Sequence, residues 1–287
     1  MRRIRAATVL THRRPTETAG ALTMLLELAQ GAGVTLRFDP EETAKHRLGE
    51  HPLVVRDAPL ARDVDLCFAL GGDGTILNAL RGYAGTRVPV FAINFGEMGF
   101  LATVDREEAW VGTQRALAGD FEVLSLPGIE VSGGGARALA INDVSIHRQP
   151  GKRVADLEYS VGGDDVGRVR CDGLVVSSPA GSTGYNLANG GPVMAWGVHG
   201  YVVSFISPHS LTARTLVVAP ADRLAVDNRS QEEPVDITVD GRPVGVLEPG
   251  KRLEARFVID QGALAQVPGT TFYQRLRQKF GRLATPI

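Results

Sequence analysis

An apolar run at residues 65–70 passes directly into Gly71-Gly72-Asp73-Gly74-Thr75 and then into a helix-like segment at 76–80. A strand made of continuous apolar residues is typical of a parallel sheet that is covered on both faces. The three glycines allow the backbone to turn tightly against a ligand, and the Asp73 carboxylate could orient a hydroxyl or a magnesium-bound phosphate. The segment therefore predicts an α/β fold that binds a ligand where this strand ends.

Two common phosphate-binding motifs do not fit this segment. A dinucleotide fingerprint starting at Gly72 would need a glycine where Leu77 stands, and no glycine-rich run ends in Gly-Lys-Ser or Gly-Lys-Thr. A surface turn is the alternative interpretation of a Gly-Gly-Asp-Gly segment. Its position after a buried strand favours a ligand-binding loop, because open α/β sheets bind ligands there.

Length and composition set broad limits. The chain has 287 residues, of which 44% are hydrophobic, so it can bury a sizeable core, and we expect two domains. A net charge of -1 argues against a dedicated nucleic-acid-binding protein. A basic cluster near the C-terminal end is interpreted as a solvated end; it consists of Arg275, Arg277, Lys279 and Arg282.

The cysteines and the apolar runs bear on the compartment. Cys67 and Cys171 lie far apart, each within an apolar run, which predicts buried thiols and a reducing cytoplasm. The apolar run near the start is too short for a signal peptide, and no run approaches membrane-spanning length. We therefore expect a cytoplasmic protein with neither membrane nor nucleic acid as a partner.

Residues 1–120 are predicted to form a Rossmann-like α/β domain. Strands are expected at 4–10, 34–38, 64–70 and 88–93, and helices at 16–31 and 106–118. Residues 121–265 then change to short alternating runs, which predict a β-rich, sandwich-like domain. Its strands are expected at 121–126, 138–147, 155–161, 173–178, 201–206, 216–219, 235–239 and 252–259, with hairpin turns at 133–135 and 162–165.

The tail, residues 266–287, returns to helical spacing. Phe272, Leu276, Phe280 and Leu283 fall on one side of a helix predicted from Phe272 to Leu283. We expect this helix to pack back on the N-terminal domain.

Three more segments carry polar groups suited to a ligand. Residues 94–101 follow the strand at 88–93, so they share a sheet edge with Gly71–Thr75 if that strand is parallel; a plain glycine-containing loop is the alternative. Residues 171–192 pass from a strand into a loop of hydroxyls, amides and glycines in which Tyr185 could lie against a heterocycle. An ordinary polar loop is the alternative there.

The third segment is Asn142-Asp143, which lies inside the predicted strand 138–147. A carboxylate beside an amide can bind the two hydroxyls of a ribose, whereas a β-bulge or a capping pair is the structural alternative. His147 and His209 have no companion carboxylate at a recognisable spacing, so we expect structural or surface roles for both.

Together these segments, from about Val64 to Lys279, resemble the NAD kinases, which phosphorylate the adenosine 2'-hydroxyl of NAD using ATP or polyphosphate. Gly71–Thr75 alone is shared with other kinases. Its combination with Asn94-x-Gly96-x-x-Gly99-Phe100-Leu101 and with the segment from Asp172-Gly173 to Gly190-Gly191-Pro192 is specific.

The resemblance implies roles for individual residues. Asp73 would be the general base or would orient the hydroxyl. Gly71, Gly72, Gly74 and Thr75 would form the phosphate-donor loop. Besides Asp73 and Gly74, the expected NAD contacts are Asn142, Asp143, Arg153, Arg170, Asp172, Thr183, Gly184, Tyr185, Asn186, Leu187, Ala188 and Arg242. Asp143 departs from the family pattern, which has a glutamate one methylene longer.

The resemblance also implies partners. Mg²⁺ or another divalent cation would act with ATP or polyphosphate, and NAD would be the acceptor. Arg170 would place a positive charge near the nicotinamide end, from which we predict that NAD is preferred over NADH. A homodimer or homotetramer is expected. Two alternatives stay open: a lipid or sphingoid-base kinase that shares Gly71–Thr75, and a non-catalytic module that senses NAD or NADP. The polar character of residues 182–189 disfavours the first, and the Asp73 carboxylate disfavours the second.

Overall fold

The computed structural model describes residues 3–96 and 99–281, and these form two compact units. Unit 1 comprises Met1–Ser125 and Gly262–Ile287, and unit 2 comprises Leu126–Gln261. The chain passes between the units within two long strands, β7 (Glu122–Gly133) and β18 (Arg252–Gln266). No helix among the described residues is long and apolar enough to cross a membrane.

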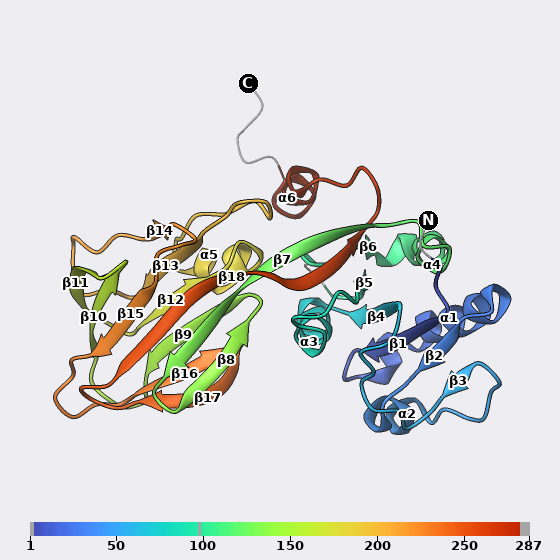
Figure 1. The fold of residues 1–287 in the computed structure, drawn as a ribbon, viewed down its shortest axis with the longest axis horizontal. Helices are drawn as coiled ribbons and strands as arrows, with labels where there is room; N and C mark the ends of the chain where they lie inside the picture. The colour runs from blue at the N-terminus through green and yellow to red at the C-terminus, as the bar shows by residue number, and fades with distance from the viewer. Residues whose placement is uncertain (1–2, 97–98, 282–287) are drawn as a thin grey trace. The chain divides into compact units, whose positions relative to one another are not determined.

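Unit 1 is built on a parallel sheet in the order β3-β2-β1-β4-β5, with β6 and the end of β18 beside β5 (Figure 1). Its strands are β1 (Ala6–Thr11), β2 (Thr35–Arg37), β3 (Val54–Val55), β4 (Leu66–Gly71), β5 (Val90–Asn94) and β6 (Val104–Asp105). The order reverses between β1 and β4, which is the Rossmann arrangement, and the carboxyl ends at this reversal are where such sheets bind ligands.

Local signals in the sequence explain the helix boundaries of unit 1. Gly33 ends one helix in the left-handed conformation at φ 67°, the Asp39 side chain caps another, and Thr271 with Gln274 forms a capping box. The helices are α1 (Ala19–Ala32), α2 (Pro40–His46), α3 (Asp73–Gly82), α4 (Ala109–Leu117) and α6 (Phe272–Phe280), with 3₁₀ turns at Pro15–Glu17 and Arg106–Glu108.

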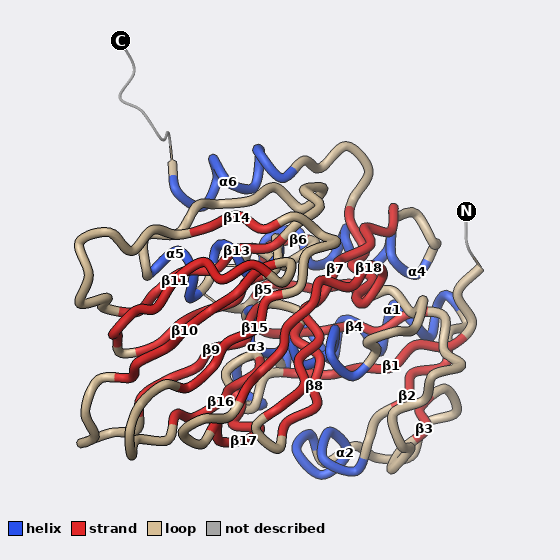
Figure 2. The backbone as a smooth tube through the Cα atoms, turned by 60° about the vertical axis from the view of Figure 1, so that its left-hand side comes forward, coloured by secondary structure: helices blue, strands red, loops and turns tan. Residues whose placement is uncertain are grey.

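Unit 2 is a β-sandwich whose two sheets share one apolar core (Figure 2). The first contains β10 (Ala155–Val161), β11 (Asp164–Cys171), β15 (Leu224–Asn228), the start of β18, most of β7, and β8 (Ala136–Ala140). The second contains β9 (Asp143–Arg148), β12 (Gly173–Ser177), β13 (Tyr201–Ile206), β14 (Leu216–Val218), β16 (Val235–Val239) and β17 (Arg242–Leu247). The predicted fold class is therefore confirmed, and α6 lies in unit 1.

Both cysteines are buried free thiols, as the sequence predicts. Cys67 lies in β4, and Cys171 ends β11. Burial raises the pKa of the Cys171 thiol to about 12, so it stays protonated and unreactive at neutral pH.

Two predicted elements differ from the structure. The expected strand 138–147 is wrong, because the chain leaves β8 at Ala140 and enters β9, in the other sheet, at Asp143. The predicted turn at 162–165 is shorter: Gly162 and Gly163 have positive φ values, and Asp164 already pairs with Val161 in the β10–β11 hairpin. Leu283, expected at the end of the last helix, lies outside the described residues, and α6 ends at Phe280.

Candidate active site

The glycine-rich segment stands at the strand-order reversal of unit 1. Gly71 ends β4, Gly72 is the N-cap of α3, and Asp73 is its first residue. Strand β5 runs parallel to β4, with Asn94 opposite Gly71, and the Phe95 N–H donates to the carbonyl of Gly71. The expectation that the segment after β5 shares this sheet edge is confirmed for residues 94–96 and 99–101, and residues 97 and 98 lie outside the described residues.

Glycine is required at Gly71 by a close approach. A Cβ atom built there would lie 2.4 Å from Oγ1 of Thr75, inside any allowed contact distance. The neighbouring loops also approach closely, since a Cβ on Gly96 would lie 3.1 Å from Cα of Gly72. Gly74 is exposed, and a Cβ there would meet nothing within 4 Å, so crowding does not explain this glycine.

The Asp73 carboxylate is fixed by two backbone donors. The N–H groups of Phe100 and Leu101 each donate to one of its oxygens, at 3.3 Å. Burial raises the pKa of Asp73, while these two hydrogen bonds and the charges of Lys279 and Arg275 oppose the rise. A carboxylate with a raised pKa at the ligand-binding edge of a parallel sheet suits a general base.

Asn94 and Asp105 form a polar network next to the segment that holds Asp73, and no sequence pattern indicated it. The Asn94 amide donates to Asp105 Oδ1 at 3.0 Å and accepts from the Gly96 N–H at 2.9 Å. Lys279 of α6 also donates to Asp105 Oδ1, at 3.0 Å. Burial alone would raise the pKa of Asp105, but these hydrogen bonds and the nearby cations outweigh it and lower the pKa.

The interpretation of the C-terminal basic cluster as solvated is wrong for two members. The Arg275 side chain is 4% exposed and Lys279 is ion-paired, because both reach the acidic and carbonyl groups of residues 102–105. Arg277 is exposed, and Arg282 lies outside the described residues.

In unit 2, Asn142 and Asp143 occupy the corner between β8 and β9 rather than the middle of a strand. The carboxylate of Asp240 accepts hydrogen bonds from the N–H groups of Ile141, Asn142 and Asp143, at 3.0, 2.8 and 3.1 Å. These bonds satisfy backbone groups that a continuous strand would pair in a ladder, which explains why the chain turns here.

Both side chains at this corner have unusual surroundings. Asp143 is 8% exposed, and burial together with the negative charge of Asp240 raises its pKa to about 7. The Asn142 side-chain oxygen is buried without a hydrogen-bond partner among the described residues. An unsatisfied buried acceptor is costly, so a ligand that donates to it would be bound favourably.

Tyr185 lies near this corner. Its ring stacks on His147, with centroids 5.5 Å apart and an interplanar angle of 14°. Burial raises the pKa of Tyr185, and the charges of Asp143 and Asp172 add to the rise. His147 covers one face of the Tyr185 ring and shares a 2.8 Å hydrogen bond with the Ser145 hydroxyl, and its structural role stays a prediction.

The predicted loop after β12 contains a 3₁₀ turn (Ala180–Thr183) and one helical turn, α5 (Tyr185–Ala188). Asn186 is fully buried, and its amide donates to the carbonyls of Ser182 and Pro192, each at 3.0 Å. That side chain holds the turn together from inside. Thr183 and Leu187 are half-buried, whereas Gly184 and Ala188 are exposed.

Asp172 has a partner that the sequence analysis missed. Arg148 Nε donates to Asp172 Oδ1, and Arg148 also donates to the Lys152 carbonyl at 3.1 Å. No pattern in the sequence indicates this pair, because it results from strand pairing: β9 pairs with β12, and the Arg148 N–H donates to the Asp172 carbonyl.

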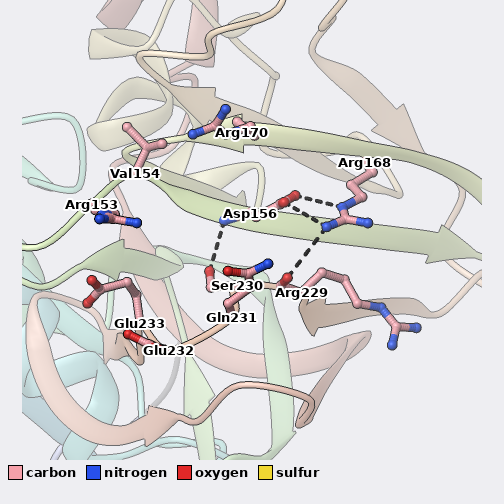
Figure 3. A pocket seen from close by; sticks show the side chains of 10 residues that line it. All are labelled: Arg153, Val154, Asp156, Arg168, Arg170, Arg229, Ser230, Gln231, Glu232 and Glu233. Atoms are coloured by element: carbon pink, nitrogen blue, oxygen red, sulfur yellow. Dashed lines mark hydrogen bonds and ion pairs between the residues drawn. The ribbon is translucent and has the colours of Figure 1, made fainter.

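Arg153 and Arg170 lie together in a different place, an open pocket of about 480 Å³ (Figure 3). Neither Asp143 nor Tyr185 is among its lining residues, which are Arg153, Val154, Asp156, Arg168, Arg170, Arg229, Ser230, Gln231, Glu232 and Glu233. Arg168 is occupied by a bidentate pair with Asp156. Arg242 is exposed at the start of β17.

The described residues contain no group of three or more His, Cys, Asp or Glu side chains that could hold a metal ion.

Family models of known proteins match two long segments of the chain. The family model described as the ATP-NAD kinase N-terminal domain matches residues 7–121, and the corresponding C-terminal model matches residues 141–257. An NAD kinase of Gemmatimonas aurantiaca is 34% identical over 281 residues, covering 95% of this chain and 94% of the relative.

Two solved structures resemble the fold. Yeast NADH kinase complexed with NADH superimposes with a TM-score of 0.88 at 21% identity, covering 100% of this chain and 90% of the yeast chain. An NAD kinase from Archaeoglobus fulgidus in complex with ATP gives a TM-score of 0.73 at 23% identity, covering 97% and 98% of the two chains.

Proposed function

The chain belongs to the NAD kinase family, and we propose that it transfers a phosphoryl group from ATP or polyphosphate to the adenosine 2'-hydroxyl of NAD, giving NADP. The main structural support for phosphoryl transfer is the position of one carboxylate. The Asp73 carboxylate stands where the strand order reverses, and two backbone N–H groups hold it in place.

In the proposed reaction, Asp73 accepts the proton of the 2'-hydroxyl as the oxygen attacks the terminal phosphorus of the donor. The bond between that phosphorus and its bridging oxygen breaks, ADP or a shortened polyphosphate leaves, and Asp73 later releases the proton to solvent. Phosphoryl transfer depends mainly on positioning and on charge neutralisation. The phosphate-donor loop would be formed by Gly71, Gly72, Gly74 and Thr75 at the start of α3, where backbone N–H groups favour a phosphate. The Thr75 N–H itself donates to the Gly72 carbonyl, at 2.9 Å.

The dinucleotide would use the residues of unit 2. Asn142 and Asp143 would bind ribose hydroxyls, which is supported by the unsatisfied Asn142 oxygen. Asp172, oriented by Arg148, would accept from the nicotinamide carboxamide. The segment from Thr183 to Ala188 would surround the adenine end.

The basic candidates would complement the phosphates. Arg153 and Arg170 share one pocket, which favours a joint role in binding an anionic group. Arg242 would add a late contact. The preference for NAD over NADH stays a prediction.

Mg²⁺, or another divalent cation, would neutralise charge on the donor phosphates and be held largely by their oxygens. ATP as donor is supported by the Archaeoglobus fulgidus NAD kinase in complex with ATP. A dinucleotide ligand is supported by the yeast NADH kinase complexed with NADH. Assembly as a homodimer or homotetramer, and a cytoplasmic location in which the two thiols stay reduced, complete the proposal.

The test is NADP formation by the purified chain with NAD and Mg²⁺, in parallel reactions with ATP and with polyphosphate. Wild type should form NADP, and Asp73→Asn should lower turnover by roughly 100-fold or more, the scale of a lost general base. Asp63→Asn, at an exposed position of unit 1, is the matched control and should behave as wild type.

The alternatives give different outcomes. Tight NAD binding without product from either donor would favour a sensing module. Phosphorylation of a sphingoid base or diacylglycerol in place of NAD would favour a lipid kinase. Turnover of Asp73→Asn at the wild-type rate would remove Asp73 from the mechanism.

A further inference from the structure

Helix α6 contributes a buried arginine to the segment that follows β5. The Arg275 side chain is 4% exposed, and its guanidinium donates to the carbonyls of Ala102 and Thr103, at 2.7 and 3.1 Å. It also lies 3.7 Å from the Asp105 carboxylate. Burying a guanidinium is costly unless its donors are paired. The two carbonyls and the Asp105 carboxylate offset this cost, and they attach α6 to residues 102–105.

Two more side chains of α6 reach the same segment. The ring of Phe280 packs against Phe100, with centroids 5.1 Å apart. Lys279 donates to Asp105, which in turn accepts from Asn94 at the end of β5. Gln278 also donates to Asp105, at 3.0 Å, so four side chains of one helix contact a short segment, residues 100–105, at its start and at its end.

That segment is the one that holds Asp73. The N–H groups of Phe100 and Leu101 are the two backbone donors to the Asp73 carboxylate. We infer that α6 is the positioning element of the general base: Arg275, Lys279 and Phe280 hold residues 100–105 so that their N–H groups aim the Asp73 carboxylate at the acceptor hydroxyl. This inference rests on the proposed function and adds to it three positioning residues that do not touch the substrate.

The electrostatics of the site support a role beyond packing. The charges that act on the Asp73 carboxylate are those of Lys279 and Arg275, both from α6, and each of these cations is also ion-paired with Asp105. Burial raises the pKa of Asp73, and the two N–H donors and the two cations oppose the rise. Loss of the Lys279 charge would raise the pKa of Asp73 further, and a protonated carboxyl cannot accept the proton of the hydroxyl.

Lys279→Ala tests the inference in the full chain, because the Lys279 side chain, 10% exposed, is less buried than that of Arg275 and its loss leaves Arg275 in place. Arg277→Ala is the matched control, since Arg277 is exposed on the same helix. For Lys279→Ala we expect kcat to fall by about 10-fold or more, the scale of a misplaced catalytic group. The KM for NAD should stay within about twofold, and the acid limb of the kcat profile should move to higher pH.

Two further variants separate positioning from folding. Lys279→Arg keeps the charge and should recover most of the activity, whereas Phe280→Leu should lower kcat without moving the acid limb, because it removes no charge. A Lys279→Ala profile that superimposes on wild type in kcat and in pH dependence would overturn the inference. The inference would also be overturned if Lys279→Arg failed to recover the kcat lost in Lys279→Ala while both variants unfolded at the wild-type denaturant concentration.

A second readout does not need turnover. The carboxyl carbon of Asp73, followed by ¹³C NMR in wild type and in Lys279→Ala, should titrate at a higher pH in the variant and at the wild-type pH in Arg277→Ala. Absence of NADP formation by wild type would contradict the proposed function, and this titration would still decide the role of α6. An Asp73 titration that is the same in all three proteins would contradict the inference even if the kinase is active.

Discussion

Asp143→Asn tests whether the carboxyl at the β8–β9 corner is held in an unfavourable environment. Asp143 is 8% exposed and lies beside Asp240, and its pKa is raised from 3.8 to about 7 by burial and by that second carboxylate. Asparagine has nearly the same shape and cannot ionise. The substitution therefore removes the charge while keeping the volume of the side chain.

The direction in which the unfolding free energy changes with pH follows from the linkage between protonation and folding. The folded state binds the Asp143 proton more tightly than the unfolded state, so the contribution to stability is complete below the unfolded pKa. It is lost as pH rises through the folded pKa of about 7. At about 1.4 kcal/mol per tenfold change in proton affinity, ionisation costs wild type about 4 kcal/mol at high pH, of which roughly 3 kcal/mol falls between about pH 5 and pH 8.

The assay is urea unfolding of the full chain at several pH values, with a tryptophan of unit 2 as the reporter. Trp196 is 7% exposed and lies in unit 2, whereas Trp110, 49% exposed, lies in unit 1 and can be replaced by phenylalanine in every protein compared. Relative to wild type, Asp143→Asn should gain about 3 kcal/mol in unfolding free energy between about pH 5 and pH 8. Asp164→Asn, exposed at the start of β11, is the control. A difference between Asp143→Asn and wild type that does not change with pH would refute the reasoning.

Two further changes test the glycine-rich turn and the partner of Asp172. Gly71→Ala should lower the unfolding free energy of unit 1 by about 1–3 kcal/mol, since its methyl group would overlap Thr75; Gly74→Ala, where nothing crowds the new methyl, should raise it by up to about 1 kcal/mol. Urea unfolding read at Trp110 checks both, and equal effects of the two substitutions would show that close packing does not select Gly71. Arg148→Met should raise the KM for NAD by about 10-fold with little change in kcat, because Asp172 loses the donor that orients it. Steady-state kinetics check this, and an unchanged KM would separate Asp172 from NAD binding.

Local patterns in the sequence were enough for the part of the fold that places Asp73. Continuous apolar runs identified β4 and β5 as buried parallel strands, and the parallel pairing then brought Gly71 and Asn94 to one sheet edge. These features depend on neighbours close in sequence and on the general rule for ligand sites in α/β sheets. For that reason Asp73 could be placed at a ligand-binding edge before its surroundings were known, whereas its role as general base was implied by the resemblance to NAD kinases.

The supports of the site depend on residues distant in sequence and could not be predicted. Asn142 leaves the strand because Asp240, about a hundred positions later, accepts its N–H group. The sequence led us to interpret Arg275 and Lys279 as part of a solvated basic end, because a cluster of cations does not indicate a buried partner. Only the fold brings Asp105 to them, more than 160 residues away in the chain.

The role of Asp73 in the phosphoryl-transfer step is tested most directly by single-turnover kinetics of wild type and Asp73→Asn. Enzyme in excess over NAD would be mixed with saturating ATP and Mg²⁺ and quenched, and NADP would be quantified, with the Kd for NAD measured separately on each protein. We expect the rate constant of Asp73→Asn to be at least about 100-fold lower while the Kd changes by less than about threefold. Equal rate constants, or a loss that lies entirely in the Kd, would contradict the assignment of Asp73 as the general base.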